Sequence, residues 1–208
     1  MGKLLIATRN PAKLKRLHEL LSDFKFELLS LDDVNIRESA LEVGDKFEQI
    51  AERKVRFYSN LSKLPTISDD SGIEIDALNG WPGPLTRRIF GLNKPEATDD
   101  ELVAETLRRM NEVPYDKRTC RFICVEALMI PGEAQVHIAR FSTEGYLLTE
   151  PYHYRRLGFP LESLFYLPQA GKTAAELDEQ GQLQNFFIHR KQAILQLAPY
   201  FKQLEQYA

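Results

Sequence analysis

Apolar residues in the first part of the chain occur in two patterns, continuous runs and helical stripes. Continuous apolar runs over residues 3–7 and 26–31 predict buried strands. Between these runs, Pro11 suits the first turn of a helix. An apolar stripe at helical spacing follows it, formed by Leu14, Leu17, Leu21 and Phe24. The pattern therefore predicts a strand, a helix and a second strand, in that order.

The rest of the chain contains both kinds of element. Further helices are predicted over residues 45–60 and 98–111, and from about Phe187 onward. Further strands are predicted over residues 73–78, 119–130 and 134–141, the last two joined as a hairpin. Strands alternate with helices early, whereas the long hairpin dominates the middle. We therefore expect an α/β fold with a mixed, bent central sheet and flanking helices, in one domain of two lobes around a cleft.

Composition narrows the class of protein. Of the 208 residues, 43% are hydrophobic and 27% are charged, as in ordinary globular proteins. The net charge of -3 argues against a protein that coats nucleic acid or an anionic membrane, because such proteins carry a basic excess. A small anionic ligand held by a few cations stays open. The apolar runs are too short for a signal peptide or a membrane span, so we expect a cytoplasmic protein.

Two cysteines, Cys120 and Cys124, lie on one predicted strand. Four positions along a strand separate them by roughly 13 Å, beyond the reach of a disulfide bond. A metal site would need further ligands nearby, and the surrounding sequence supplies none. We therefore expect both cysteines to be packing residues.

The first candidate site is the segment from Thr8 to Lys13, between the first strand and its helix. Free backbone N–H groups and the positive end of the helix dipole meet at such a position, which suits phosphate. Thr8 and Asn10 can donate hydrogen bonds to phosphate oxygens, and Lys13 adds a positive charge one turn later. The structural alternative is that Asn10 caps the helix beside a solvated lysine.

The second candidate site is the acidic pair Asp69-Asp70. Adjacent carboxylates repel each other unless a cation or hydrogen-bond donors compensate. The pair therefore suits a divalent metal ion or a general base. A plain acidic turn is the alternative, although the flanking apolar runs favour a position near the core.

The third candidate site is His189-Arg190, at the start of the C-terminal helix. An arginine suits a phosphate or the edge of a base, and a histidine suits a ring stack or a hydrogen bond. The alternative is a solvated helix face.

Together these motifs resemble those of the inosine triphosphate pyrophosphatase family, which hydrolyses non-standard purine nucleoside triphosphates. The matching segments follow the family order and are Ala7-Thr-Arg-Asn-Pro-Ala-Lys13, Ser68-Asp-Asp-Ser-Gly-Ile73, Ala77-Leu-Asn-Gly-Trp-Pro-Gly83, Gly171-Lys-Thr-Ala-Ala-Glu-Leu177 and His189-Arg190. The resemblance implies a two-lobed α/β fold, a homodimer, and Mg²⁺ as cofactor. It implies hydrolysis of a nucleoside triphosphate to the monophosphate and pyrophosphate.

The resemblance also implies roles at the reacting phosphates. Thr8, Asn10 and Lys13 would bind the triphosphate. Asp70 would be the base that activates the attacking water, and both Asp70 and Asp69 would be metal ligands. Attack at the α-phosphorus needs neutralised charge and a base in reach, which the cationic and acidic segments supply together.

For the nucleoside, the resemblance implies that Ser71 contacts the nucleotide and that His189 and Arg190 recognise the purine. The family's base-binding loop, Gly-Phe-Gly-Tyr-Asp-Pro, appears here as Gly158-Phe-Pro-Leu-Glu-Ser163. In that loop Phe159 would keep the stacking role, while Glu162 replaces the aspartate.

One metal-binding glutamate of the family is replaced in this chain. The family pattern Phe-x-Glu-Asn-Ala corresponds to Phe47-Glu-Gln-Ile-Ala51, so Gln49 stands at the glutamate position. A neutral amide is a poorer ligand for Mg²⁺ than a carboxylate. We expect weakened Mg²⁺ binding unless Glu48 substitutes as a ligand, the alternative being that Glu48 is solvated. A nucleotide-binding protein with weak or lost hydrolysis is therefore the alternative function.

Overall fold

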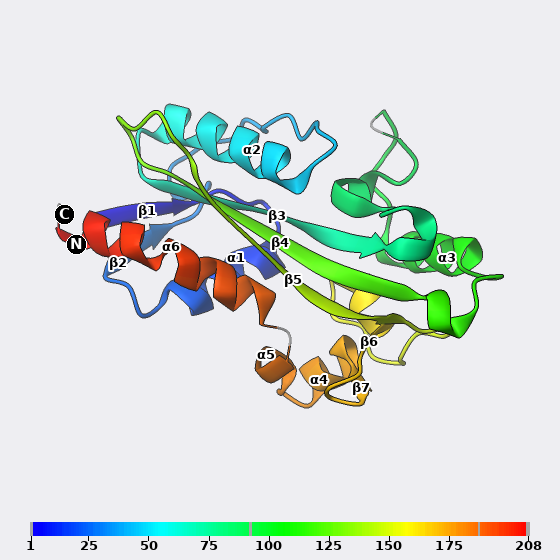
Figure 1. The fold of residues 1–208 in the computed structure, drawn as a ribbon. Helices are drawn as coiled ribbons and strands as arrows, with labels where there is room; N and C mark the ends of the chain where they lie inside the picture. Colours follow the sequence, from blue (N-terminus) through cyan, green and yellow to red (C-terminus); the bar gives the residue numbers. More distant parts are fainter. Residues whose placement is uncertain (1, 92, 187, 207–208) are drawn as a thin grey trace. The chain divides into compact units, whose positions relative to one another are not determined.

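The computed structural model describes residues 2–91, 93–186 and 188–206 (Figure 1). Within these residues one sheet contains seven strands in the order β2-β1-β3-β4-β5-β6-β7. The strands are β1 (Gly2–Ile6), β2 (Phe26–Leu29), β3 (Thr66–Ile75), β4 (Thr119–Met129), β5 (His137–Leu147), β6 (Phe165–Leu167) and β7 (Lys172–Thr173). The helices are α1 (Pro11–Leu21), α2 (Phe47–Ser62), α3 (Asp99–Arg109), α4 (Ala174–Glu179), α5 (Leu183–Phe186) and α6 (His189–Gln206).

The direction of strand pairing changes across the sheet. Strand β1 pairs in parallel with β2 and β3, whereas β6 pairs antiparallel with β5 and β7. The predicted mixed α/β fold is therefore confirmed. The described residues form two compact units, one drawn from the ranges 1–71, 124–141 and 190–208 and the other from the ranges 72–123 and 142–189, as far as these ranges are described.

In the first unit, helices cover both faces of β1. Successive side chains of a strand point to opposite faces. Leu4 and Ile6 accordingly join the core cluster that contains Phe201 of α6 and residues of α1. Leu5 joins a different cluster, with Tyr58 of α2. Figure 1 shows the same arrangement, with α2 on one side of β1 and with α1 and α6 on the other.

The apolar stripes predicted for the first and last helices lie in this core. Leu17 and Leu21 of α1 are fully buried. The buried residues of α6 include Ala193, Ile194, Leu197 and Phe201. The last helix begins at His189, and Phe187, the predicted start, lies outside the described residues.

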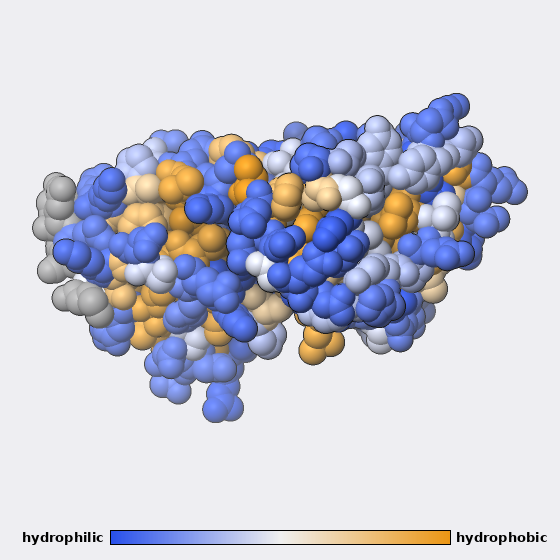
Figure 2. All heavy atoms as spheres, turned by 90° about the horizontal axis from the view of Figure 1, so that it is seen from below, coloured by the Kyte–Doolittle hydropathy of each residue, from blue (hydrophilic) through white to orange (hydrophobic). Residues whose placement is uncertain are grey.

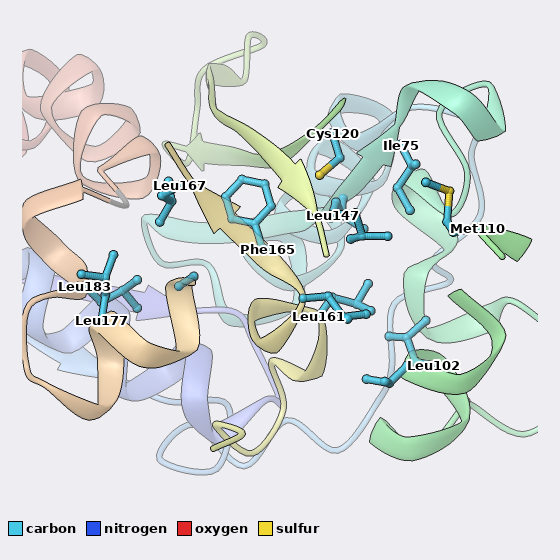
Figure 3. Packing of buried hydrophobic residues seen from close by; sticks show 14 of the residues in the cluster. Ile75, Leu102, Met110, Cys120, Leu147, Leu161, Phe165, Leu167, Leu177 and Leu183 are labelled. Atoms are coloured by element: carbon cyan, nitrogen blue, oxygen red, sulfur yellow. The ribbon is translucent and has the colours of Figure 1, made fainter. Parts of the chain in front are cut away.

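The second unit has its own core, shown in Figure 3. The ring of Phe165 in β6 packs edge-on against Phe122, with 4.8 Å between the ring centroids. Strand β5 passes so close to β6 that a Cβ at Gly145 would lie 2.5 Å from the carbonyl oxygen of Tyr166. Only glycine fits at this position.

Strand β3 differs from its prediction. It begins at Thr66 and continues through Asp69 and Asp70 to Ile75, where a short 3-10 turn follows. The predicted strand over residues 73–78 is therefore the last part of a longer strand that ends at Ile75 and includes the acidic pair, and the alternative of a plain acidic turn is wrong. Acidic residues can occupy a buried strand when cations compensate their charge, and such cations are present here, as described below.

Strand β5 also differs, because it covers His137–Leu147 instead of residues 134–141. Its second half alternates between buried and exposed positions, with Thr143, Gly145 and Leu147 buried. Threonine and glycine at buried positions give a weak hydrophobic pattern, which explains why the sequence alone placed the end of the strand too early.

Cys120 and Cys124 are free and buried in β4, which confirms that they are packing residues. None of the helices in the described part of the chain is both long and apolar enough to cross a membrane. Hydrophilic side chains cover much of the face drawn in Figure 2, with hydrophobic groups between them.

Arg118 is a buried cation in the second unit, with 2% of its surface exposed. Its guanidinium donates hydrogen bonds to the carbonyl oxygens of Met110 at 2.7 Å, Val113 at 3.2 Å, Leu147 at 2.7 Å and Leu148 at 3.0 Å. It therefore ties the segment after α3 to the end of β5.

The change Arg118→Met should destabilise the protein, because it leaves these buried carbonyl groups without donors. We expect the free energy of unfolding to fall by about 3 kcal/mol in urea denaturation. Arg108→Met is the control, since that side chain is 69% exposed and pairs with Glu105 on the same helix. A loss at Arg118 no larger than the loss at Arg108 would contradict this role.

Candidate active site

The turn between β1 and α1 places Thr8, Asn10 and Lys13 together. The Asn10 Oδ1 atom accepts hydrogen bonds from the backbone N–H groups of Ala12 at 2.9 Å and Lys13 at 3.3 Å, so Asn10 is the N-cap of α1. The Thr8 hydroxyl oxygen accepts a hydrogen bond from the Asn10 N–H at 3.3 Å. The predicted cap is confirmed, but Lys13 is not a solvated lysine, because its ammonium group contacts Asp69.

Asp69 is fully buried in β3 and is held by cations from two helices. Its Oδ2 atom lies 2.9 Å from Lys13 Nζ of α1 and 2.9 Å from Arg190 Nη1 of α6. Burial opposes ionisation of Asp69, but Lys13, Arg190 and Lys54 outweigh it and hold the pKa of Asp69 well below its usual range. Asp69 is therefore a permanently charged centre of the first unit.

Two further residues of this cluster, Lys54 and Glu42, were missed by sequence reasoning. Lys54 is buried in α2, and its Nζ atom donates to the backbone carbonyl of Asp69 at 2.8 Å and lies 3.1 Å from Glu42 Oε1. Burial favours the neutral amine, but Asp69, Glu42 and Asp70 together raise the pKa of Lys54 above its ordinary value.

A signal for Lys54 was present in the sequence. It lies four residues from both Ile50 and Tyr58, so it occupies the inward face of the predicted helix. A lysine on a buried face needs an anionic partner. No comparable pattern marks Glu42, which lies in the irregular segment before α2.

Asp70 lies next to Asp69, but its pKa is shifted in the opposite direction. It is 7% exposed, and its Oδ2 atom has no hydrogen-bond partner among the described residues. Burial raises the pKa of Asp70 to about 7, with Lys13 and Lys54 opposing the shift and Asp69 and Glu42 adding to it. A carboxylate that titrates near neutral pH is suited to accept a proton from water.

Arg190 is buried and does not lie on a solvated helix face, so that alternative is wrong. Besides its contact with Asp69, Arg190 Nη1 lies 3.0 Å from Glu126 Oε1, and Nη2 donates to the Ser71 hydroxyl at 3.1 Å. His189, its neighbour in sequence, is also buried, and its Nδ1 atom lies 2.9 Å from the Thr143 hydroxyl. Contacts of Ser71, His189 and Arg190 with a nucleotide stay a prediction.

Glu48, the predicted replacement for a metal ligand at position 49, and Gln49 itself lie at the start of α2. Both side chains have protein partners there. Glu48 Oε1 lies 2.8 Å from Arg140 Nη1. Gln49 Oε1 accepts a hydrogen bond from the backbone N–H of Asp45 at 3.3 Å, just before the helix begins. Glu48 is therefore not merely solvated, and its role as a metal ligand stays a prediction.

In the second unit, Phe159 and Glu162 form a cluster with Arg156. Glu162 is almost fully buried, and its carboxylate accepts two hydrogen bonds from the Arg156 guanidinium, at 3.0 and 2.5 Å. The Arg156 guanidinium carbon also lies 4.1 Å from the centroid of the Phe159 ring. Arg156 thus holds both predicted nucleoside-binding residues, whose contact with a substrate stays a prediction.

These features define a class of protein: an α/β protein with a helix start suited to anions beside a buried carboxylate that titrates near neutral pH. The chain belongs to the Ham1 family, whose profile matches residues 4–200. The family resemblance inferred from the motifs is therefore confirmed.

Individual relatives match over nearly their whole length. The chain is 35% identical over 207 residues to a protein named dITP/XTP pyrophosphatase from Vibrio cholerae, covering 99% of this chain and 98% of that protein. It is 36% identical over 196 residues to the protein of that name from Geobacter sulfurreducens, covering 93% of this chain and 94% of the relative. The solved structure of the Staphylococcus aureus Ham1 protein superposes with a TM-score of 0.81 at 25% identity, covering 97% of this chain and 99% of that one.

The change Asp70→Asn should stabilise the metal-free protein more at pH 8.5 than at pH 5. The pKa of Asp70 rises from 3.8 to about 7 on folding, so ionisation of Asp70 lowers stability as the pH rises through this window. Asparagine cannot ionise and avoids that cost. We expect the gain in the free energy of unfolding to be roughly 2 to 3 kcal/mol larger at pH 8.5, from urea denaturation in EDTA.

The control is Asp23→Asn, which changes an exposed carboxylate of the same unit and should have a small effect at both pH values. An equal effect of Asp70→Asn at pH 5 and pH 8.5 would mean that Asp70 titrates as an ordinary aspartate.

Proposed function

We propose that this chain hydrolyses dITP and XTP, and other non-standard purine nucleoside triphosphates, to the nucleoside monophosphate and pyrophosphate. The near full-length similarity to proteins named dITP/XTP pyrophosphatase supports the substrate class. The observation that carries the reaction is the juxtaposition of Asp70 with Lys13 and Lys54, because it combines a proton acceptor with two cations.

Hydrolysis at the α-phosphorus needs a water that loses its proton as it attacks. Asp70 is the group that accepts this proton, since it is a buried carboxylate whose pKa in the metal-free protein lies near neutrality. Lys13 and Lys54 balance the negative charge of the phosphates, and the Thr8 hydroxyl and the side-chain NH2 group of Asn10 donate hydrogen bonds that orient them beside the positive end of the α1 dipole.

The residues present fit a divalent metal ion. Mg²⁺ takes hard oxygen ligands and retains several waters, so one or two carboxylates suffice to hold it. Asp70 offers a buried, unpartnered carboxylate oxygen, and Glu42 lies close enough to raise the pKa of Asp70. The described residues contain no group of three or more His, Cys, Asp or Glu side chains that could hold a metal by themselves.

We assign Asp70 and Glu42 as the ligands of Mg²⁺, which would neutralise charge on the phosphates when bound. Glu42 enters this proposal because its charge contributes to the raised pKa of Asp70. Glu48, which pairs with Arg140 as Glu42 pairs with Lys54, stays the other candidate ligand. Asp69 stays a further candidate, since its Oδ2 atom already contacts two cations while its Oδ1 atom has no hydrogen-bond partner among the described residues.

Purine recognition by Phe159, Glu162, His189 and Arg190 completes the proposal. It rests on their match to the family motifs, as do the homodimer and the cytoplasmic location. The alternative of a nucleotide-binding protein without hydrolysis is not favoured, because the proton acceptor Asp70 is present with neighbouring cations.

A nucleotide panel tests the proposed reaction. With Mg²⁺ present, dITP, ITP and XTP should release pyrophosphate, and orthophosphate should not appear. Asp70→Asn should lower turnover by about 10²-fold or more, typical of losing a general base, while Asp23→Asn should not. Release of orthophosphate, or normal turnover by Asp70→Asn, would refute the proposal.

Lys13→Met should raise the KM for dITP by about tenfold and change kcat much less, because it removes a charge from the bound phosphates. Lys15→Met is the matched control, since Lys15 is an exposed lysine on the same helix. If KM stays at the wild-type value in a folded Lys13 variant, Lys13 serves only as the counterion of Asp69.

A further inference from the structure

Glu126 is a buried carboxylate in β4 that has no part in the mechanism above. It is fully buried, and its Oε1 atom lies 3.0 Å from Arg190 Nη1 and accepts a hydrogen bond from the Cys124 thiol at 3.2 Å. Its Oε2 atom has no hydrogen-bond partner in the described part of the chain. A buried charge that is only half satisfied is costly, which calls for an explanation.

The contacts of Glu126 lead directly to the phosphate-binding lysine. Three successive distances of 2.9, 2.9 and 3.0 Å connect Lys13 to Asp69, Asp69 to Arg190, and Arg190 to Glu126. The charges of these four side chains alternate along the row of ion pairs, so two cations face two anions. Burial and the charge of Asp69 raise the pKa of Glu126 to about 7, so these four side chains are together neutral when Glu126 is ionised, as at pH 8.5.

Without Glu126, the remaining three side chains of this row of ion pairs would carry one net positive charge. Asp69 would then be the only anion for both Lys13 and Arg190, and the phosphates would meet a more positive site. All four groups are largely buried, where charges interact more strongly than in water.

Arg190 does not need Glu126 simply to stay in place, because Asp69 and Ser71 also accept hydrogen bonds from it. The carboxylate of Glu126 therefore mainly changes the net charge of this row of ion pairs. A phosphate site that releases a product as highly charged as pyrophosphate benefits from a limit on its own positive charge.

We propose that Glu126 is a positioning residue that acts on Lys13 through Arg190 and Asp69, and that it limits the affinity of the site for pyrophosphate. The inference rests on the proposed function for its biological meaning. The testable effect is that the negative charge of Glu126 weakens the binding of a polyanion next to Lys13.

The test is calorimetric titration of inorganic pyrophosphate into the folded protein at pH 8.5 in EDTA. Glu126→Gln removes the charge and keeps the shape, so the Kd for pyrophosphate should fall about fivefold. Glu126→Asp keeps the charge and should stay within about twofold of the wild type. With Mg²⁺ and dITP, Glu126→Gln should also lower KM and strengthen product inhibition by pyrophosphate.

Glu133→Gln is the charge control, because it removes one negative charge from the hairpin beside His137, outside the cluster. It should leave the Kd unchanged. Should Glu126→Gln not fold, Glu126→Met supplies a second uncharged side chain.

An unchanged or higher Kd in the uncharged variants, even with a lower melting temperature, would make Glu126 a structural counterion and overturn the proposal. The same holds if Glu126→Asp behaves like Glu126→Gln, or if no form of the protein binds pyrophosphate. A wild type that binds pyrophosphate but hydrolyses no nucleotide would instead refute the proposed function, so the two failures are distinguishable.

Discussion

The buried charge of Asp69 is the constraint on which the first unit depends. A carboxylate without water must be surrounded by donors and cations, or the cost of removing it from solvent is not compensated. Lys13 of α1 and Arg190 of α6 contact its side chain, and Lys54 of α2 binds its backbone carbonyl. One residue of β3 thus connects three helices that the hydrophobic core alone would hold less specifically.

Asp70, the next residue of β3, has a raised pKa, whereas the pKa of Asp69 is lowered. Neighbouring residues of a strand point to opposite faces, so two adjacent aspartates can have different surroundings. Cations lower the pKa of Asp69, whereas burial raises the pKa of Asp70 to about 7. Pairs of carboxylates whose pKa values are driven apart in this way can divide the roles of fixed charge and proton acceptor.

The departures from the family motifs also have local physical reasons. Glu162 stands where the family motif has an aspartate, and Arg156, six residues earlier, compensates its buried charge and packs against Phe159. Gln49 replaces a glutamate, and its amide oxygen accepts the Asp45 N–H just before α2 begins. In both places the substituted side chain has a partner close by in sequence.

The sequence by itself determined most helices and strands, the Asn10 cap, the packing role of the cysteines and the family, because these depend on local periodicity and on contiguous motifs. It did not reveal that Asp69 and Asp70 lie inside a continuous strand, since that depends on cations brought from α1, α2 and α6. Glu42 and Glu126 are isolated acidic residues in sequence and acquire meaning only from their contacts with Lys54 and Arg190. The tertiary structure alone decided these contacts, because a buried ion pair is defined by the meeting of distant segments and leaves no periodic signal along the chain.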